Sequence, residues 1–460
     1  MALKRKTPRE WLAEKPKRQV SQGKHKLLIL GAAGRDFHNF NVVYRKDRHV
    51  DVVAFTASQI PGIAGRRYPP SLAGRLYPEG IPIEEEKNLE KLIEEKAVEE
   101  CVLSYSDLSY NTVMHLASRV LAAGAKFSML GAEQTMLKSS KPVVAVVAVR
   151  TGCGKSQTTR RVVEILREAG KKVVAVRHPM PYGDLEKEKV QRYKTLRDLK
   201  KYECTIEEME EYEPHIMMGS VLYTGVDYGA ILKRVEKEAD IIVWDGGNND
   251  TSFYKPDVTI TVADPLRAGH EISYYPGEVN FRLADAIVIN KIDSAQPPAV
   301  QEIIENAKKY NDSARIIKAE SVITIEKPEL IRNKKVLVVE DGPTLTHGDM
   351  KTGAGVVAAK RGGAAEIIDP RPWVTGTIKE TFERYPDIGA LLPAMGYGEA
   401  QMRDLEETIN RVECDSVVIG TPIDLGRFLK ITKPSTRVRY ELAESAKEEL
   451  RDVLRQKQII

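Results

Sequence analysis

Short apolar runs alternate along the chain with longer segments in which apolar residues recur every three or four positions. The runs that begin at Lys26 (KLLILG), Asp51 (DVVAFTAS) and Val143 (VVAVVAV) have the length and the branched composition of buried strands. The run at Val143 is followed by a segment with the spacing of an amphipathic helix. Strands that alternate with helices usually pair in parallel, so the pattern predicts a multi-domain α/β protein.

Changes in this pattern divide the chain into three predicted units that follow a basic lead, residues 1–23. A Rossmann-like α/β unit is expected over 24–138. A second α/β unit is expected over 139–330, with a charged, mostly helical insert at 184–238. A small C-terminal α/β unit, 331–460, is expected to bind a substrate.

Composition narrows the class of protein without naming a partner. The 460 residues are 42% hydrophobic and 30% charged, with a formal net charge of +4, which gives no general case for nucleic acid or membrane binding. The four cysteines lack CxxC spacing, which argues against a disulfide framework and a structural zinc site. The lead has no secretory signal pattern. We therefore expect a cytoplasmic protein, with thermophile-like composition, that forms a homo-oligomer such as a dimer.

The strongest motif follows the apolar run at Val143. The sequence TGCGKS lies between a predicted strand and a predicted helix, as in a loop that cradles phosphates with backbone N–H groups. The usual first glycine is replaced by Val149, so a glycine-rich turn that happens to carry a lysine is the alternative. If the loop binds nucleotide, the binding residues are Gly152, Cys153, Gly154, Lys155, Ser156 and Gln157.

Two further motifs follow in order, each at a strand end. DIIVWDGG ends in Asp245, which with Ser156 would hold Mg²⁺, although an aspartate that caps a turn is the alternative. DAIVINKID presents Asn290, Lys291 and Asp293, the NKxD pattern whose carboxylate bonds guanine, and Ala319 could offer a backbone N–H to the base. The order of motifs predicts a P-loop NTPase domain that uses GTP or ATP.

These motifs resemble the SIMIBI branch of P-loop proteins. WDGGNND is similar to a segment of the urease-accessory GTPases, and the combination with a Rossmann-like unit and EDGPTLTHG resembles archaeal GTPases described as cyclic 2,3-diphosphoglycerate synthetase-like. That likeness extends over about residues 24–429. It implies nucleotide-driven closure of an intramolecular phosphoanhydride on 2,3-diphosphoglycerate, with ATP as the donor.

A phosphoryl-transfer enzyme also needs cations near the γ-phosphate. Arg177 and His178 end the strand after the loop helix, so the predicted catalytic residues are Lys155, Asp245, Arg177 and His178. His178 could equally be polar surface. Glu213 and His215 lie close together in the insert, and a metal site that they share with His178 is possible but incomplete.

Two glycine-rich loops could hold a second ligand. THGDMKTGAG, in the C-terminal unit, is long and polar for a connector and predicts a cradle for a phosphorylated acid at Thr344, Thr346, His347, Asp349 and Lys351. The turn 31–34 could bind a phosphate that is read by Arg35, Asp36 and His38, but it lacks the full dinucleotide fingerprint.

Together these features predict Mg²⁺-dependent phosphoryl transfer from a nucleoside triphosphate to a small phosphorylated acid. The alternative is a GTPase of the regulatory or metallochaperone type, in which hydrolysis switches a protein partner. WDGGNND and NKID motivate that alternative.

Overall fold

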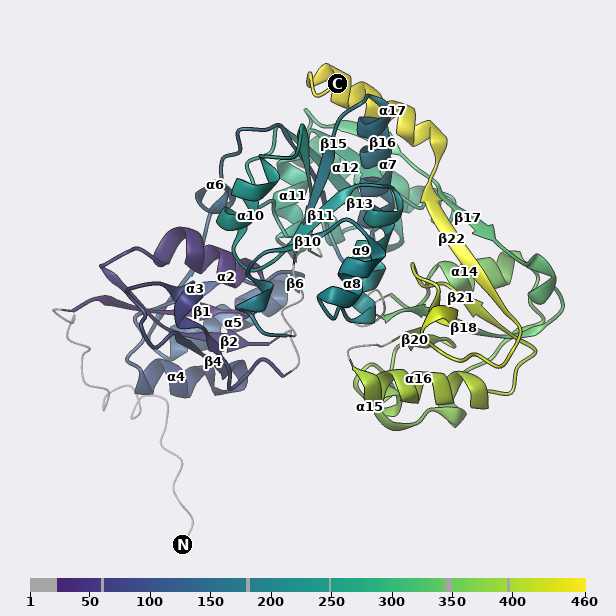
Figure 1. The fold of residues 1–460 in the computed structure, drawn as a ribbon, viewed down its shortest axis with the longest axis horizontal. Coiled ribbons are helices and arrows are strands. Elements are labelled where there is room, and N and C mark those ends of the chain that lie inside the picture. The colour runs from purple at the N-terminus through teal and green to yellow at the C-terminus, as the bar shows by residue number, and fades with distance from the viewer. Residues whose placement is uncertain are drawn as a thin grey trace, which may run out of the picture.

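The structure is a computed structural model that describes residues 23–58, 62–178, 183–247, 250–342, 345, 350–394 and 398–460. Three sheets lie in a row, each with its own helices (Figure 1). The predicted α/β class with several sheets is thus confirmed in its coarse form.

The first sheet has six strands in the order β3-β4-β2-β1-β5-β7, and only β3 with β4 is antiparallel among the described pairs. A buried aromatic cluster that includes Phe37, Phe40 and Phe55 covers one face. The strands are β1 (His25–Leu30), β2 (Val50–Ala57), β3 (Arg67–Tyr68), β4 (Ile81–Glu85), β5 (Glu100–Leu103) and β7 (Lys126–Met129). The helices are α2 (Arg35–Asn39), η1 (Phe40–Tyr44), α3 (Pro70–Ala73), η2 (Glu86–Asn88), α4 (Leu89–Glu95), α5 (Tyr110–Ala122) and α6 (Ala132–Thr135).

The central sheet has eight strands in the order β10-β11-β9-β12-β8-β13-β15-β16. Every residue of β8, β12 and β13 is buried, as expected for parallel strands that helices cover on both faces. The strands are β8 (Val143–Ala148), β9 (Val173–Arg177), β10 (Gln191–Tyr193), β11 (Val221–Thr224), β12 (Ile241–Gly246), β13 (Val258–Ala263), β15 (Ala286–Ile289) and β16 (Arg315–Lys318). The helices are α7 (Lys155–Glu168), η3 (Lys187–Lys189), α8 (Leu196–Lys201), α9 (Ile206–Met217), α10 (Tyr228–Val235), η4 (Pro265–Arg267), η5 (His270–Ile272), α11 (Gly277–Arg282) and α12 (Pro297–Tyr310).

The insert 184–238 is less helical than predicted. It contains α8, α9 and α10, but its β11 pairs in parallel with β9 and its β10 pairs with β11, so the insert extends the central sheet. A small ribbon joins the first two units, because β14 (Tyr274–Tyr275) pairs with β6 (Leu108–Ser109).

The third sheet has the path β17-β22-β21-β18-β19, with β20 also paired to β18. Its strands are β17 (Ser321–Ile325), β18 (Lys335–Asp341), β19 (Glu366–Ile367), β20 (Leu392–Ala394), β21 (Ser416–Ile419) and β22 (Ser435–Leu442). Its helices are η6 (Pro328–Leu330), α14 (Ala354–Arg361), η7 (Arg371–Trp373), α15 (Gly376–Arg384), α16 (Glu399–Arg411) and η8 (Leu425–Arg427). None of the helices in the described ranges has the length and apolar character needed to cross a membrane.

The last helix, α17 (Glu444–Gln456), belongs to the central unit rather than to the third one. Leu450 and Leu454 are fully buried in the same core as Val162 and Val163 of α7. In Figure 1, α17 lies beside α7 and β16, at the end of the long strand β22. The third sheet and the predicted unit 331–460 therefore have different limits. Strand β17, which precedes residue 331, belongs to the third sheet, and helix α17, which ends the chain, packs in the central core.

Replacing Leu450 by alanine tests this packing. The change removes a fully buried side chain and should lower the free energy of unfolding by about 2–5 kcal/mol. Leu121→Ala is the control, because Leu121 is 60% exposed. Urea unfolding followed by circular dichroism measures both, and equal stability of the two variants would contradict the assigned packing of α17.

Candidate nucleotide and acceptor site

The loop after β8 has the backbone of a phosphate-binding loop. Gly152 and Gly154 adopt φ values of +80° and +100°, which glycine accepts without steric cost, and Gly154 caps α7. Val149 does not have positive φ, and its N–H continues the sheet by donating to the Val262 carbonyl at 3.0 Å. The position of the missing glycine therefore does not require the positive φ that would exclude valine.

Asp245, at the end of β12, is the hub of the site. Its Oδ1 accepts hydrogen bonds from Lys155 Nζ at 2.8 Å and from Thr159 Oγ1 at 2.7 Å. Its Oδ2 lies 2.5 Å from the Arg177 guanidinium and 2.9 Å from His215 Nε2. The strand end thus joins the loop helix, β9 and α9 through one buried carboxylate.

Electrostatics follow from this pairing. Burial by itself would raise the pKa of Asp245, but Lys155, Arg177 and the His215 hydrogen bond hold that pKa well below its usual range. Burial lowers the pKa of Lys155, and neighbouring Arg177 lowers it further. The pKa of Arg177 is raised by Glu211 and Asp245 against the effect of burial. Asp245 is therefore ionised at neutral pH and compensates buried cations.

Asn290 and Lys291 brace the loop from the next strand end. Asn290 Nδ2 donates to the Cys153 carbonyl at 2.9 Å, and Lys291 Nζ donates to the Gly152 carbonyl at 2.6 Å. Lys291 also pairs with buried Asp264 at 2.8 Å. The structure thus brings these two NKxD residues to the loop backbone.

The other two residues predicted to contact the base have partners within the protein. Asp293 Oδ1 accepts from the Ser321 N–H at 3.0 Å, and its Oδ2 pairs with Arg361 at 2.9 Å. The Ala319 N–H donates to the Ile289 carbonyl within the sheet, so Ala319 does not offer it to a base as predicted. Gln157 also turns to the third sheet, where its amide oxygen accepts from Ser321 Oγ at 3.3 Å.

The first unit holds the loop through Asp107. Its carboxylate accepts from Arg150 Nε at 2.5 Å and from Thr151 Oγ1 at 2.6 Å. Arg150 is 1% exposed and lies over the Tyr274 ring, 3.6 Å from its centroid. Asp107 itself adopts φ +64°, a conformation that is costly for a residue other than glycine. Through this contact the first unit helps to fix the conformation of the loop.

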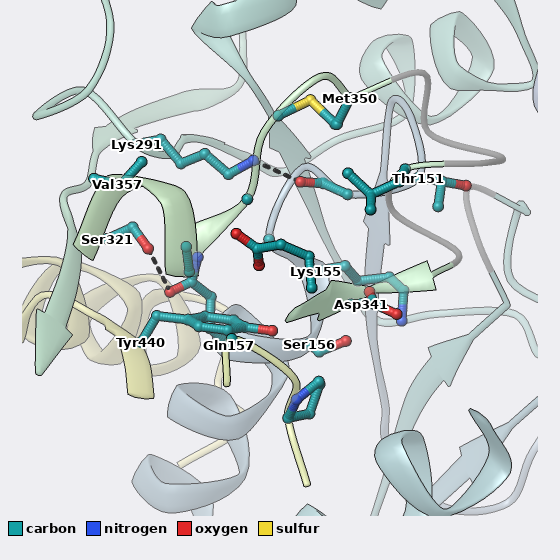
Figure 2. A pocket seen from close by; sticks show the side chains of 18 of the residues that line it. Thr151, Lys155, Ser156, Gln157, Lys291, Ser321, Asp341, Met350, Val357 and Tyr440 are labelled. Atoms are coloured by element: carbon teal, nitrogen blue, oxygen red, sulfur yellow. Dashed lines mark hydrogen bonds between the residues drawn. The ribbon is translucent and has the colours of Figure 1, made fainter. Parts of the chain in front are cut away.

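One pocket joins the loop to α9 and the third unit. Figure 2 shows Lys155 and Ser156 of the loop with Asp341 and Tyr440 of the third unit around it. The cationic side chains that line the pocket come from the loop and its neighbouring elements, whereas the anionic ones come from α9 and the end of β18. The cationic residues are Arg150, Lys155, Arg160, Arg177 and Lys291, and the anionic residues are Glu210, Glu211, Glu340 and Asp341.

Burial disfavours the ionised form of two of these acids, Glu340 and Glu210. Glu340 is 3% exposed, and burial raises its pKa to about 8, although the Val356 N–H donates to it at 2.8 Å. Burial, followed by repulsion from Asp341, raises the pKa of Glu210 well above its usual range. A cation in the pocket would relieve both effects.

The predicted Mg²⁺ ligands fit only in part. Asp245 already accepts four donors, so both of its oxygens are engaged. Ser156 lines the pocket, and its hydroxyl lies 3.4 Å from a Glu211 carboxylate oxygen. A hydroxyl, a carboxylate and nucleotide phosphates are the oxygen donors that Mg²⁺ accepts. Ser156 and Glu211 would supply such donors, although Glu211 Oε2 is also paired with Arg177 at 2.6 Å.

The histidines predicted as catalytic or metal-binding are separated. His178 lies at the contact with the first unit, 3.5 Å from Asp250 and tight against Gly34, and it does not line the described pocket. His215 Nε2 instead donates to the Asp245 carboxylate at 2.9 Å, and Glu213 pairs with Arg427. The described residues contain no cluster of three or more His, Cys, Asp or Glu placed for a metal. The His178–Glu213–His215 site is therefore wrong.

The predicted acid cradle is only partly visible. Thr344, Thr346, His347 and Asp349 lie outside the described residues, and Lys351 is exposed and not among the described lining residues. The start of α14 is already filled, because Glu340 accepts from backbone N–H groups there. Any side chain at position 353 would clash with the Glu340 carboxylate, so only glycine leaves room for that carboxylate here.

Backbone N–H groups at the turn 31–34 donate to a side chain of the protein and are not free to bind a phosphate. Asp36 Oδ1 accepts from the Ala33 and Phe37 N–H groups at 2.6 and 2.7 Å, where a phosphate would lie. Arg35 pairs with Asp250 at 3.1 Å, and the His38 ring stacks on Phe253. These residues join the first unit to the central one.

Sequence reasoning missed several residues of the pocket. Glu210 and Glu211 of α9 line the pocket, and with buried Glu207 they repeat at helical spacing. Acidic residues at helix positions that an amphipathic pattern would make apolar could have indicated a buried acidic site. Asp107, Glu340 and Tyr440 have no such signal, because only the tertiary fold brings them to the loop.

No family model matches the chain. Arginine synthetase ArcE of Thermococcus kodakarensis is 61% identical over 443 residues, which cover 96% of this chain and 97% of that protein. Among solved structures, LpxK from Aquifex aeolicus in complex with ATP is 12% identical, covers 70% of this chain and 90% of its own, and has a TM-score of 0.41. The hydrogenase maturation factor HypB from Archaeoglobus fulgidus is 20% identical, covers 41% and 83%, and has a TM-score of 0.25.

Both TM-scores are below 0.5, so the two solved structures carry no weight for function. The loop is identified as phosphate-binding by its own backbone conformation and by its position between β8 and α7. The name of the 61% identical relative does not include cyclic 2,3-diphosphoglycerate, so that part of the resemblance is not confirmed.

Asp245→Asn tests the hub. Loss of the charge leaves Lys155 buried without an acidic partner and Arg177 with Glu211 alone, and it should lower the free energy of unfolding by about 3–5 kcal/mol. Because folding depresses the pKa of Asp245, this stabilisation is complete above its ordinary value of 3.8 and is lost as the pH falls below it. Urea unfolding at pH 7 and pH 3 measures the difference, and an equal gap at both pH values would refute the assignment.

Asp107→Asn tests the hold of the first unit on the loop. Loss of the charged hydrogen bond to Arg150 should weaken ATP binding about tenfold, as measured by calorimetric titration. Glu95→Gln, an exposed change in the same unit, should have no effect. Unchanged affinity of the Asp107 variant would show that the contact only joins the units.

Proposed function

The chain belongs to the family of arginine synthetase ArcE, and on that premise we propose that it is a nucleoside triphosphate-dependent synthetase that forms arginine. The observation that carries the proposal is the single pocket in which a phosphate-binding loop and a group of buried carboxylates meet. The loop suits a polyphosphate, and the carboxylates suit a cationic product such as arginine.

The chemistry of arginine indicates which acceptor such an enzyme would use. A ureido precursor differs from arginine by an oxygen in place of one guanidinium nitrogen. Transfer of the γ-phosphoryl group to the ureido oxygen forms a P–O bond and releases the nucleoside diphosphate. A nitrogen nucleophile then attacks the carbon, and the C–O bond breaks to release inorganic phosphate and leave the guanidinium.

Residues of the pocket have distinct roles in this proposal. The backbone of 152–156 with Lys155 binds the phosphates, and Lys155 exchanges its contact with Asp245 for the γ-phosphoryl group. Arg177, held by Glu211 and Asp245, stabilises charge on the transferring group. Bound Mg²⁺, held by Ser156 and Glu211, would neutralise phosphate charge. His178 has only a structural part, at the contact between units.

ATP is the donor we propose. Guanine selection through NKID needs the Asp293 carboxylate, and that carboxylate is bound to Arg361 and the Ser321 N–H. A guanine base would have to break both contacts. GTP remains the donor favoured by the motif alone.

Two other functions follow from the sequence and are less suited to the pocket. A small phosphorylated acid such as 2,3-diphosphoglycerate would meet four carboxylates, which repel an anion. A regulatory GTPase would need no acceptor. Neither accounts for an acidic group beside the loop.

The reaction can be followed directly by phosphorus NMR and amino acid analysis. Protein with Mg²⁺, ATP, citrulline as the ureido compound and ammonium should yield inorganic phosphate and arginine in equal amounts. Lys155→Ala should slow product formation about a hundredfold or more, because one stabilising cation is lost.

Arms with GTP or 2,3-diphosphoglycerate separate the alternatives. A cyclic phosphoanhydride product would establish the acid as acceptor. Nucleotide hydrolysis that is indifferent to citrulline would support the GTPase. Either result, without arginine, refutes the proposed function.

A further inference from the structure

Glu210 is a buried acid with an unused oxygen that lines the pocket. It lies on α9, is 4% exposed, and its Oε1 has no hydrogen-bond partner. Leaving such a group unsatisfied costs free energy, and proteins rarely do so without a functional reason. A ligand atom that donates to Oε1 would remove this cost.

Asp341 brings a second carboxyl to the same place from another unit. It ends β18, lines the pocket, and shares a side-chain hydrogen bond with Glu210. Two carboxyls that meet across units match a planar guanidinium, whose several N–H groups donate in fixed directions. A single ammonium would satisfy fewer of these oxygens.

The cations of the protein do not fill this place. Arg177 is held by Glu211 and Asp245, and Lys155 is held by Asp245. Lys291 is engaged by Asp264 and the Gly152 carbonyl. Arg150 and Arg160 are likewise engaged, by Asp107 and by the Tyr440 carbonyl. Glu210 shares a side-chain hydrogen bond with Asp341, so a guanidinium that donates to both acids would replace the proton between them.

Apolar side chains elsewhere in the same pocket suit the rest of such a ligand. Ile323, Met350 and Val357 line the same pocket, and Figure 2 shows Met350 and Val357 around it. A guanidinium on a short methylene chain would place its charge on the acids and its methylenes on this apolar surface.

We propose that Glu210 and Asp341 form the subsite for the guanidinium group of the amino acid ligand. The subsite deepens the proposed function and rests on it for the identity of that ligand as arginine. It places specificity on α9, within the segment 184–238, and on β18 of the third unit.

Calorimetric titration of the full chain in the presence of ADP and Mg²⁺ tests the subsite. Arginine, agmatine (a guanidinium without the carboxylate) and citrulline (the neutral ureido isostere) are the probes. The unaltered protein should bind arginine and agmatine more tightly than citrulline. Glu210→Gln and Asp341→Asn should each weaken binding of arginine and agmatine about tenfold to a hundredfold, with citrulline little changed.

Glu208→Gln is the matched control. It makes the same chemical change on the same helix, where Glu208 caps its own helix start and glutamine can do the same. Titration with ADP alone shows whether each variant keeps a working loop.

The outcomes separate the two proposals. If the unaltered protein binds arginine and both variants bind it equally well, the subsite is wrong while arginine formation stands. If agmatine binds in a Glu210-dependent way but arginine does not, the subsite stands and the proposed function is wrong. Binding of neither guanidinium compound overturns the subsite.

Discussion

The site depends on one constraint, which is that the buried carboxylate of Asp245 needs positive partners. Lys155, Arg177 and His215 reach it from α7, β9 and α9, so a single acid positions three elements of the central unit. The insert that carries α9 is thereby attached to the end of β12. Its acidic face, including Glu210 and Glu211, consequently lies beside the phosphate-binding loop.

The other two units act on the same loop. Asp107 of the first unit holds Arg150 and Thr151, while β22 of the third unit contacts α7, since Arg160 donates to the Tyr440 carbonyl at 3.0 Å. The first unit thus contacts the loop on one side, and groups of the third unit that line the pocket face it on the other. An enzyme that transfers a phosphoryl group from a nucleotide to a separate acceptor needs such an arrangement, because proximity and orientation supply much of the rate.

Local patterns in the sequence predicted the strands and turns whose conformation depends on neighbouring residues. Fully apolar runs predicted β8 and β12, and TGCGKS predicted the turn into α7, because strand burial and glycine conformations are encoded within a few residues. The partners of charged residues were not predictable in this way. His178 and His215 look alike in sequence, yet one lies at a contact between units and the other on Asp245. The packing of α17 was not predictable from local pattern either, since this helix returns to the central core after the third sheet.

The most direct test of the account is a crystal structure with a non-hydrolysable ATP analogue and arginine bound together. The account predicts the γ-phosphate in contact with Lys155, which then no longer pairs with Asp245, and the guanidinium between Glu210 and Asp341 in the same pocket. Nucleotide phosphates away from 152–156, or arginine bound outside that pocket, would contradict it.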